Sequence, residues 1–196
     1  MLHSFARIVG HGLAVLPFVP FRATRTGPDL DVEHGALFAR VIPFEGGYKS
    51  KCDQNTASLY QVVEISGGPV PGDWRVETMV FRCAWPEGFE LASPTRADDE
   101  VPFYLQAPGG ACLYIRDAGN APPLADLRAP DQTRVAIGPD FVEFAYRFQG
   151  APWRQRHARV ELEGHPFMIS LQAPEAGVDA LRPAFEEVRG SFESSG

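Results

Sequence analysis

The side chains that most often perform chemistry in proteins are sparse in this chain. Its five histidines are His3, His11, His34, His157 and His165. His157 and His165 flank one predicted hairpin, but antiparallel pairing across Glu163-Gly164 would leave them offset, and the sequence implies no third ligand. We therefore expect ordinary surface histidines, with no metal site and no other cofactor.

Two further segments have the residue types of ligand sites without the required spacing. Asp29, Asp31 and Glu33 precede His34 and could hold a cation, but the Gly and the distal Glu of an EF-hand loop are missing. The loop 46–52 places both lysines of the chain beside two glycines, where a phosphate could approach the backbone, yet its order is not that of a P-loop. We interpret the first as a solvated acidic turn and the second as a hairpin tip.

Catalytic motifs are also missing from the sequence. Neither G-x-S-x-G, which marks a serine nucleophile, nor the patterns G-x-x-x-x-G-K-[ST] and G-x-G-x-x-G occur. The densest acidic run, Asp98-Asp99-Glu100, is typical of a solvated turn, and nothing pairs it with a second carboxylate. The sequence leaves enzyme activity open and favours a protein without it.

The segment Trp153–Arg159 is the best candidate for a binding site. It is the most basic stretch of an acidic protein, and it begins with a tryptophan. Trp and Arg are enriched among the residues that dominate binding energy at interfaces, so we predict that Trp153, Arg154 and Arg156 bind a partner. The alternative is a tryptophan that caps the sheet beside solvated arginines.

Length, composition and charge are those of one globular domain. The 196 residues are 44% apolar and 22% charged, and the net charge of -7 argues against binding to nucleic acid or to an anionic membrane. The apolar stretch 13–21 is interrupted by Pro17 and Pro20, and it resembles neither a signal peptide nor a membrane span. Three widely spaced cysteines give no zinc motif and are typical of a reducing compartment. We expect a cytoplasmic protein.

Alternation of apolar and polar residues predicts strands over most of the chain. In the N-terminal part it predicts strands at 37–42, 59–65 and 75–83, so residues 1–85 form a β-rich extension. Further strands are predicted at 101–105, 111–115, 133–137 and 141–148, followed by a hairpin at 157–171. The segment 117–132 is rich in Pro, Ala and Asp and predicts a long surface excursion.

One helix is predicted near the C-terminus, because apolar residues recur there at spacings of three and four from Val178 to Val188. Pro183 predicts a bend in this segment, with the regular helix at 182–189 and Gly190 as its C-cap.

These elements together predict an α+β fold, a large antiparallel sheet with the C-terminal helix packed on one face. We expect Phe185 and Val188 of the helix to be buried beneath strands that contribute Phe144, Val160 and Ile169.

The C-terminal half has the order strand, hairpin, strand, short break, helix. The residues that define this order are Tyr146-Arg147-Phe148, the hairpin His157–Leu171, Ala173-Pro174, Pro183-Ala184-Phe185-Glu186-Glu187-Val188 and Ser191-Phe192, with Gly88-Phe89-Glu90-Leu91-Ala92-Ser93-Pro94 as an opening strand. In these features residues 87–193 resemble the PsbP/DcrB-like superfamily, whereas residues 1–85 depart from it. The resemblance implies an antiparallel sheet sandwiched by helices and a non-catalytic accessory or binding protein, and it carries no catalytic residue over.

Three functions remain open at this point. The sequence favours a non-catalytic accessory protein that binds another protein, and a bacterial secretion-associated or toxin-neutralising (immunity-type) role is one specific form of it. The alternative is small-molecule binding or hydrolysis in a pocket between the N-terminal strands and the main sheet. A third is a structural subunit that self-associates through an exposed edge strand. The sequence does not set the oligomeric state.

Overall fold

The computed structural model describes residues 6–45, 47–52, 60–64, 73–95, 100–127 and 130–195. The strands are β1 (Arg7–Gly10), β2 (Leu13–Pro17), β3 (Arg22–Thr26), β4 (Asp29–His34), β5 (Leu37–Phe44), β6 (Gly47–Cys52), β7 (Tyr60–Glu64), β8 (Arg75–Glu77), β9 (Phe81–Ala84), β10 (Glu90–Ala92), β11 (Tyr104–Gln106), β12 (Cys112–Asp117), β13 (Thr133–Ile137), β14 (Phe141–Phe148), β15 (Ala151–Leu162), β16 (His165–Pro174) and β17 (Glu193–Ser194). The helical segments are η1 (Pro108–Gly110), η2 (Leu124–Asp126) and α1 (Val178–Gly190).

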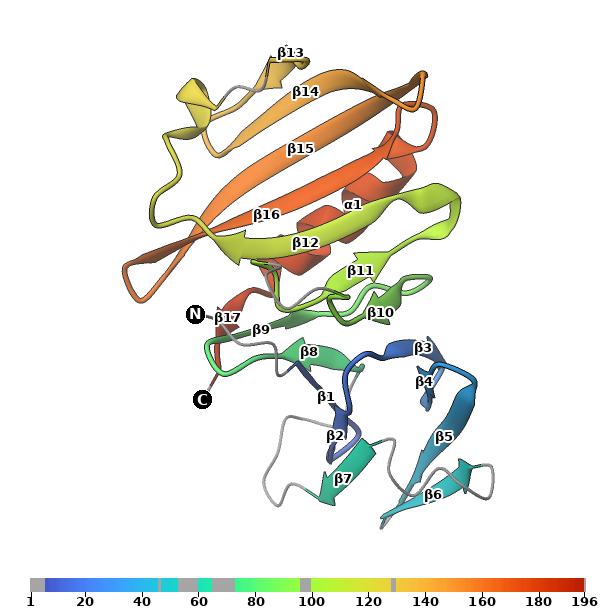
Figure 1. Ribbon diagram of the computed structural model, residues 1–196. Coiled ribbons are helices and arrows are strands. Elements are labelled where there is room, and N and C mark those ends of the chain that lie inside the picture. Colours follow the sequence, from blue (N-terminus) through green and yellow to red (C-terminus); the bar gives the residue numbers. More distant parts are fainter. Residues whose placement is uncertain are drawn as a thin grey trace.

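The strands form two antiparallel sheets within the described part of the chain (Figure 1). The larger sheet has the order β13-β14-β15-β16-β12-β11-β10-β3-β4-β5-β6, and the smaller has the order β17-β9-β8-β1-β2-β7. Since β3 pairs with β10, residues from before and after position 86 belong to the same sheet. The prediction of a mostly antiparallel β fold with a C-terminal helix is therefore confirmed in its broad form.

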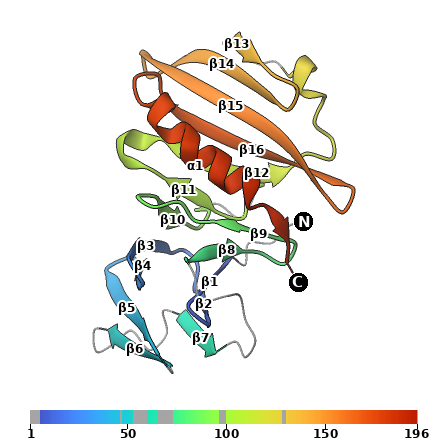
Figure 2. The same ribbon diagram turned by 180° about the vertical axis from the view of Figure 1, so that it is seen from behind.

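Helix α1 covers one face of the larger sheet, which we call the helix face. It lies behind β16 and β12 in Figure 1 and in front of them in Figure 2. Phe185 and Val188 are fully buried there, as is Ile169 of β16. The expectation about Phe144 is wrong, because the neighbouring residue Glu143 faces the helix and Phe144 is buried on the opposite face. We call that opposite face the open face.

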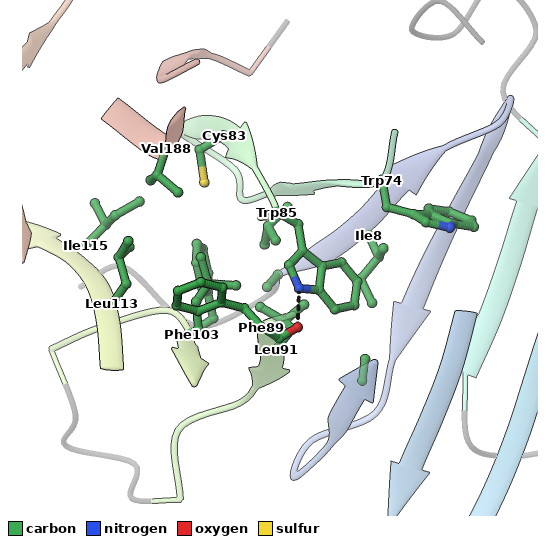
Figure 3. Packing of buried hydrophobic residues seen from close by; sticks show 14 of the residues in the cluster. Ile8, Trp74, Cys83, Trp85, Phe89, Leu91, Phe103, Leu113, Ile115 and Val188 are labelled. Carbon is green, nitrogen blue, oxygen red and sulfur yellow. Dashed lines mark hydrogen bonds between the residues drawn. The ribbon is translucent and has the colours of Figure 1, made fainter. Parts of the chain in front are cut away.

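The smaller sheet completes the core beside α1. The ring of Phe81 on β9 lies 6.1 Å from Phe103 and 5.5 Å from Phe167, between ring centroids. Trp85 is buried nearby, and its indole Nε1 donates a hydrogen bond of 2.8 Å to the carbonyl of Phe89 (Figure 3). The segment 73–95 therefore packs into the same core as the C-terminal strands and helix.

The predicted strand at 75–83 is two strands, β8 and β9, joined by a tight turn. The hydroxyl of Thr78 accepts hydrogen bonds from the backbone N–H groups of Val80 at 3.2 Å and Phe81 at 3.0 Å. A Thr side chain that bonds its own following backbone favours a turn over a continuous strand. The alternation changes phase across this turn, since Val76 is buried before it and Phe81 and Cys83 are buried after it, whereas Val80 is exposed. The prediction of one continuous strand missed this change.

The helix also differs from its prediction at two positions. It runs unbroken from Val178 to Gly190 with Pro183 inside it, so the proline removes one backbone hydrogen bond without ending the helix. We attribute its continuity to the burial of the Phe185 and Val188 side chains in the following turns. Gly190 is the last helical residue rather than the cap, and the N–H of Ser191 bonds to the carbonyl of Glu187.

Candidate functional site

The three predicted partner-binding residues lie on β15, where successive side chains point to opposite faces of the sheet. Trp153 is on the open face. Arg154 and Arg156 are on the helix face. The structure therefore does not bring the three side chains together on one surface, and partner binding through them remains a prediction.

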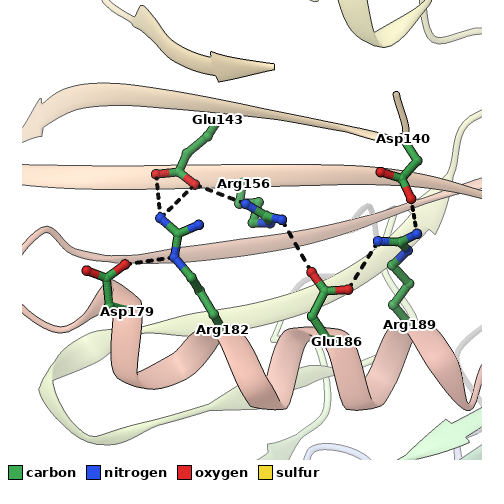
Figure 4. A network of polar contacts seen from close by, with 7 residues as sticks. All are labelled: Asp140, Glu143, Arg156, Asp179, Arg182, Glu186 and Arg189. Carbon is green, nitrogen blue, oxygen red and sulfur yellow. Dashed lines mark hydrogen bonds and ion pairs between the residues drawn. The ribbon is translucent and has the colours of Figure 1, made fainter. Parts of the chain in front are cut away.

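Arg156 lies between the sheet and α1 with only 7% of the residue exposed (Figure 4). Its guanidinium pairs with Glu143 of β14 at 3.3 Å and with Glu186 of α1 at 3.3 Å. The same guanidinium is 3.7 Å from the centroid of the Phe141 ring, a close cation–π contact. A buried cation with two carboxylates and an aromatic face holds the helix on the sheet.

The surrounding charges complete this network. Arg182 of α1 lies 3.2 Å from the Glu143 carboxylate, and Arg189 pairs with both Glu186 and Asp140. Arg154 pairs with Glu175 and is 3.9 Å from Glu143. Since these cations are occupied by the protein's own carboxylates, the basic segment seen in the sequence is not a free basic patch.

Three aromatic side chains form a partly exposed cluster at one end of the open face, which we call the aromatic corner: Tyr146, Phe148 and Trp153. The Trp153 ring centroid lies 5.3 Å from that of Phe148 and 6.4 Å from that of Tyr146. Phe148 is 49% exposed. Trp153 also reaches the η1 turn, because a Cβ on Gly110 would stand 3.7 Å from its ring. The corner is thus an aromatic surface that is partly open to solvent.

An uncharged, hydrogen-bonded row continues from the corner across the open face. The Tyr114 hydroxyl accepts hydrogen bonds from the amides of Gln155 at 3.2 Å and Gln172 at 2.9 Å. Gln155 is bonded in turn by the amide of Gln132 at 2.7 Å. Tyr114, Gln155 and Gln172 come from β12, β15 and β16, Gln132 directly precedes β13, and all four are partly buried. The row offers polar groups in fixed positions without a charge.

The segment around η2, residues 118–127, covers the other end of the open face. Arg134 of β13 donates a hydrogen bond to the carbonyl of Ala125 in this segment, and η2 contacts β14 and β15. His157 is buried on this face and bonds through Nδ1 to the Ser170 hydroxyl at 2.8 Å. The expectation of a surface histidine is therefore wrong for His157.

The His157–Ser170 pair resembles a base and nucleophile in composition but not in setting. Ser170 is 0% exposed and His157 is 6% exposed. Burial lowers the pKa of His157 to about 4, with a smaller contribution from the charge of Arg116. A neutral, enclosed pair of this kind is a structural hydrogen bond, because a nucleophile must be reached by its substrate.

The remaining candidates of the sequence are dispersed. His165 of β16 pairs with Asp117 at 3.0 Å beside the β15–β16 turn. It lies opposite Leu162, which follows His157 on β15 by five residues. Asp31 pairs with Arg40 at 2.5 Å. Among the described residues no three His, Cys, Asp or Glu side chains are placed to hold a metal. His3, Gly46, Asp98 and Asp99 lie outside the described residues.

The two lysines and the cysteines Cys83 and Cys112 have structural explanations. Lys49 and Lys51 lie on β6, the last strand of the larger sheet, where a charged side chain discourages pairing with another chain. Burial raises the pKa of the Cys83 thiol to about 12 and that of the Cys112 thiol to about 12. Both thiols are therefore protonated and unreactive at neutral pH.

Two hollows lie where the N-terminal strands join the main sheet, the region that the sequence proposed for a pocket. The first, of about 270 Å³, lies on the open face between β3, β4, β10 and β11, and Phe21, Arg22, Glu33 and Tyr104 are among its lining residues. The second, of about 420 Å³, has Arg22 and Gln106 in common with the first. We call the first one the junction hollow.

Sequence reasoning missed the residues that matter most in these surfaces. The alternation along β14 places Tyr146 and Phe148 on one face, so a signal for the aromatic corner existed. Nothing in the sequence indicates which end of that face is covered by the segment around η2. The opposition of Arg22 and Glu33 across β3 and β4 requires the strand register.

Comparisons with known proteins find structural similarity but no match of sequence. No family model matches the chain, and no curated protein matches it. The solution structure of cyanobacterial PsbP (CyanoP) from Synechocystis sp. PCC 6803 is similar at 13% identity and a TM-score of 0.33, covering 59% of this chain and 86% of that chain. A PsbP protein is thus a distant neighbour of this fold, and the likeness assigns neither a site nor a function.

A search of the described residues for membrane-spanning helices found none of sufficient length and apolar character.

Proposed function

We propose that this chain is a non-catalytic binding protein that recognises another protein through the aromatic corner of its open face. The observation that carries the proposal is the solvent-exposed cluster of Phe148, Trp153 and Tyr146. Large aromatic side chains dominate binding energy at protein interfaces because they bury much apolar area with few rotatable bonds.

The surroundings of the corner support the same proposal. The neighbouring row of Gln155, Gln172 and Tyr114 provides polar groups that are already held in place by hydrogen bonds. Protein interfaces typically combine an apolar centre with a polar rim, and pre-ordered side chains reduce the entropy lost on binding. A secretion-associated role and a toxin-neutralising role in the bacterial cytoplasm are two specific forms of this proposal. The identity of the partner would distinguish the two roles.

The proposal is tested by comparing partner capture by the wild-type chain with two variants. Trp153→Ala together with Phe148→Ala should abolish recovery of the partner, because the double substitution removes the centre of the corner. Met79→Ala is the matched control, since Met79 is an 81% exposed apolar residue on the β8–β9 turn. A partner that is retained by the corner variant and by the control would refute the proposed surface.

A second candidate function is small-molecule binding in the junction hollow. The observation that favours it is the hollow itself, which is lined by apolar and charged side chains from the N-terminal strands and the main sheet. Ligand sites are concave, mostly apolar and supplied with a few convergent polar groups. A thermal-shift screen of metabolites with the wild-type chain tests it, because a ligand of the folded state raises the melting temperature.

A further inference from the structure

The junction hollow has opposite charges on its rim that do not neutralise each other. Arg22 of β3 and Glu33 of β4 are register partners in an antiparallel pair, and both line the hollow. Opposite charges in such positions have Cβ atoms about 5 Å apart and usually attract each other directly. Here no ion pair joins them. The Arg22 guanidinium instead lies 3.2 Å from Glu90 of β10.

Each of the two charges is available to a ligand. The Arg22 side chain is 62% exposed, and one carboxylate contact uses only part of the five N–H donors of a guanidinium. Glu33 is exposed and makes no ion pair or side-chain hydrogen bond with any residue that the structure describes. A cation and an unneutralised anion therefore lie side by side at the mouth of one hollow.

The rest of the hollow is uncharged and small. Tyr104 and Ala92 contribute side chains to its wall, Ser93 and Thr95 add hydroxyl groups, and Gln106 adds an amide. Its volume of about 270 Å³ corresponds to about nine water molecules at about 30 Å³ each. This is just below the range of sites for drug-sized ligands, which begins at about 300 Å³.

We propose that the junction hollow binds a zwitterionic small molecule, a free α-amino acid with an apolar side chain. Arg22 would take the carboxylate through paired N–H donors, Glu33 would take the ammonium group, and the side chain would lie against Ala92 and Tyr104. A ligand with only a carboxylate would leave Glu33 without a partner, and a ligand with only an ammonium group would leave the N–H donors of Arg22 that do not contact Glu90 unused. The proposal deepens the second candidate function and rests on it.

The test is a titration of the isotope-labelled full-length chain with L-leucine, followed by NMR. N-acetyl-leucine lacks the ammonium group, leucinamide lacks the carboxylate, and N-acetyl-leucinamide lacks both. We expect L-leucine to shift the resonances of residues around the hollow, and each blocked compound to bind at least tenfold more weakly. Arg22→Gln and Glu33→Gln should each weaken leucine binding at least tenfold.

Arg159→Gln and Glu161→Gln are the matched controls. Both residues lie on β15 outside the hollow, on the same face of the strand as each other, and they should leave leucine binding unchanged. Thermal unfolding of every variant verifies that the fold is intact.

Two results would overturn the inference in different ways. Equal binding of leucine and N-acetyl-leucinamide at the hollow refutes the zwitterion and leaves the hollow as a ligand site. Absence of any leucine-induced shift at millimolar concentration also refutes the zwitterion. If, in addition, no compound of the metabolite screen raises the melting temperature, the second candidate function fails as well.

Discussion

At the scale of single residues, Arg156 shows how burial decides between binding and stability. The side chain lies under α1 between Glu143 and Glu186, so its charge holds the protein together. Arg159, three positions further along the same strand, is half-buried on the open face and has no ion pair among the described residues. Alternation along the strand separates the two arginines onto opposite faces, but it does not show which face meets the helix.

Replacement of Arg156 by Ala should lower the free energy of unfolding by about 3 kcal/mol, because breaking a buried ion pair leaves an uncompensated charge. Denaturant unfolding followed by circular dichroism measures this change. Arg159→Ala is the control and should change the free energy by less than about 0.5 kcal/mol, as expected for a surface substitution. Equal effects of the two substitutions would contradict the assignment of Arg156 to the network.

His157 makes stability depend on pH in a defined window. Its pKa falls from 6.5 in the unfolded chain to about 4 in the folded protein, mainly through burial. The unfolded state therefore binds more protons between these pH values, and stability that is fully present above pH 6.5 is lost as the pH falls toward 4. The loss from this group is at most about 3 kcal/mol, at about 1.4 kcal/mol per unit of pKa.

The measurement is the difference in unfolding free energy between the wild type and His157→Gln as a function of pH. Carboxyl groups such as Asp117 and Glu193, whose pKa values are also lowered, contribute equally to both proteins and cancel in the difference. The difference should change between pH 6.5 and 4 and be constant above that window. A flat difference curve would show that His157 is not buried in its neutral form.

At the scale of elements, two glycines in different surroundings should respond in opposite directions to the same substitution. Gly10 on β1 lies against Trp74, and a Cβ at this position would stand 2.8 Å from the indole ring and 3.0 Å from the Trp74 backbone. Gly190 in the last turn of α1 has open space where its Cβ would be. The absence of a side chain at Gly10 allows β1 to pack against Trp74, which directly precedes β8. Gly190 has no such packing role.

Gly10→Ala should lower the free energy of unfolding by about 2 kcal/mol through overpacking against Trp74. Gly190→Ala should raise it by about 0.5 kcal/mol, since Ala restricts the unfolded chain and is the better helix former. Thermal or denaturant unfolding of the two variants measures both effects. A destabilised Gly190→Ala variant would mean that this glycine does serve as the C-cap that its sequence position suggests.

At the scale of the whole molecule, the N-terminal and C-terminal parts depend on each other. Strand β3 protects the edge of β10, and Phe81 and Trp85 fill the core beneath α1. A chain reduced to residues 87–196 would expose that edge and lose these side chains. The region that resembles the PsbP/DcrB-like superfamily is thus embedded in a larger structure.

We expect the fragment 87–196 to lack cooperative unfolding and to bind hydrophobic dyes, since its core would be open on one side. Near-ultraviolet circular dichroism and a thermal scan of the fragment, beside the full-length chain, measure this. A fragment with a sharp transition and native aromatic signals would show instead that residues 87–193 fold independently and that the preceding strands are an addition.

The fold could be predicted from the sequence where local patterns suffice. The alternation at Phe141–Phe148, the Glu163-Gly164 turn and the spacing of Phe185 and Val188 predicted β14, the β15–β16 hairpin and α1. For the candidate sites, the sequence predicted some of the residue types but not their arrangement. Trp153 was predicted as a binding residue, and alternation placed Tyr146 and Phe148 on one face of their strand. Their position beside Trp153 and the opposition of Arg22 to Glu33 depend on strand register and were not predicted.

The sequence by itself determined which residues share a side of each strand and of the helix, because those periodicities follow from backbone geometry alone. Only the tertiary structure decided which side meets α1, which meets the segment around η2 and which stays in water. That choice buried Arg156 and left Trp153 at the surface, although they are three residues apart in the chain. The choice of face results from contacts between segments that are far apart in the sequence, and no local pattern encodes those contacts.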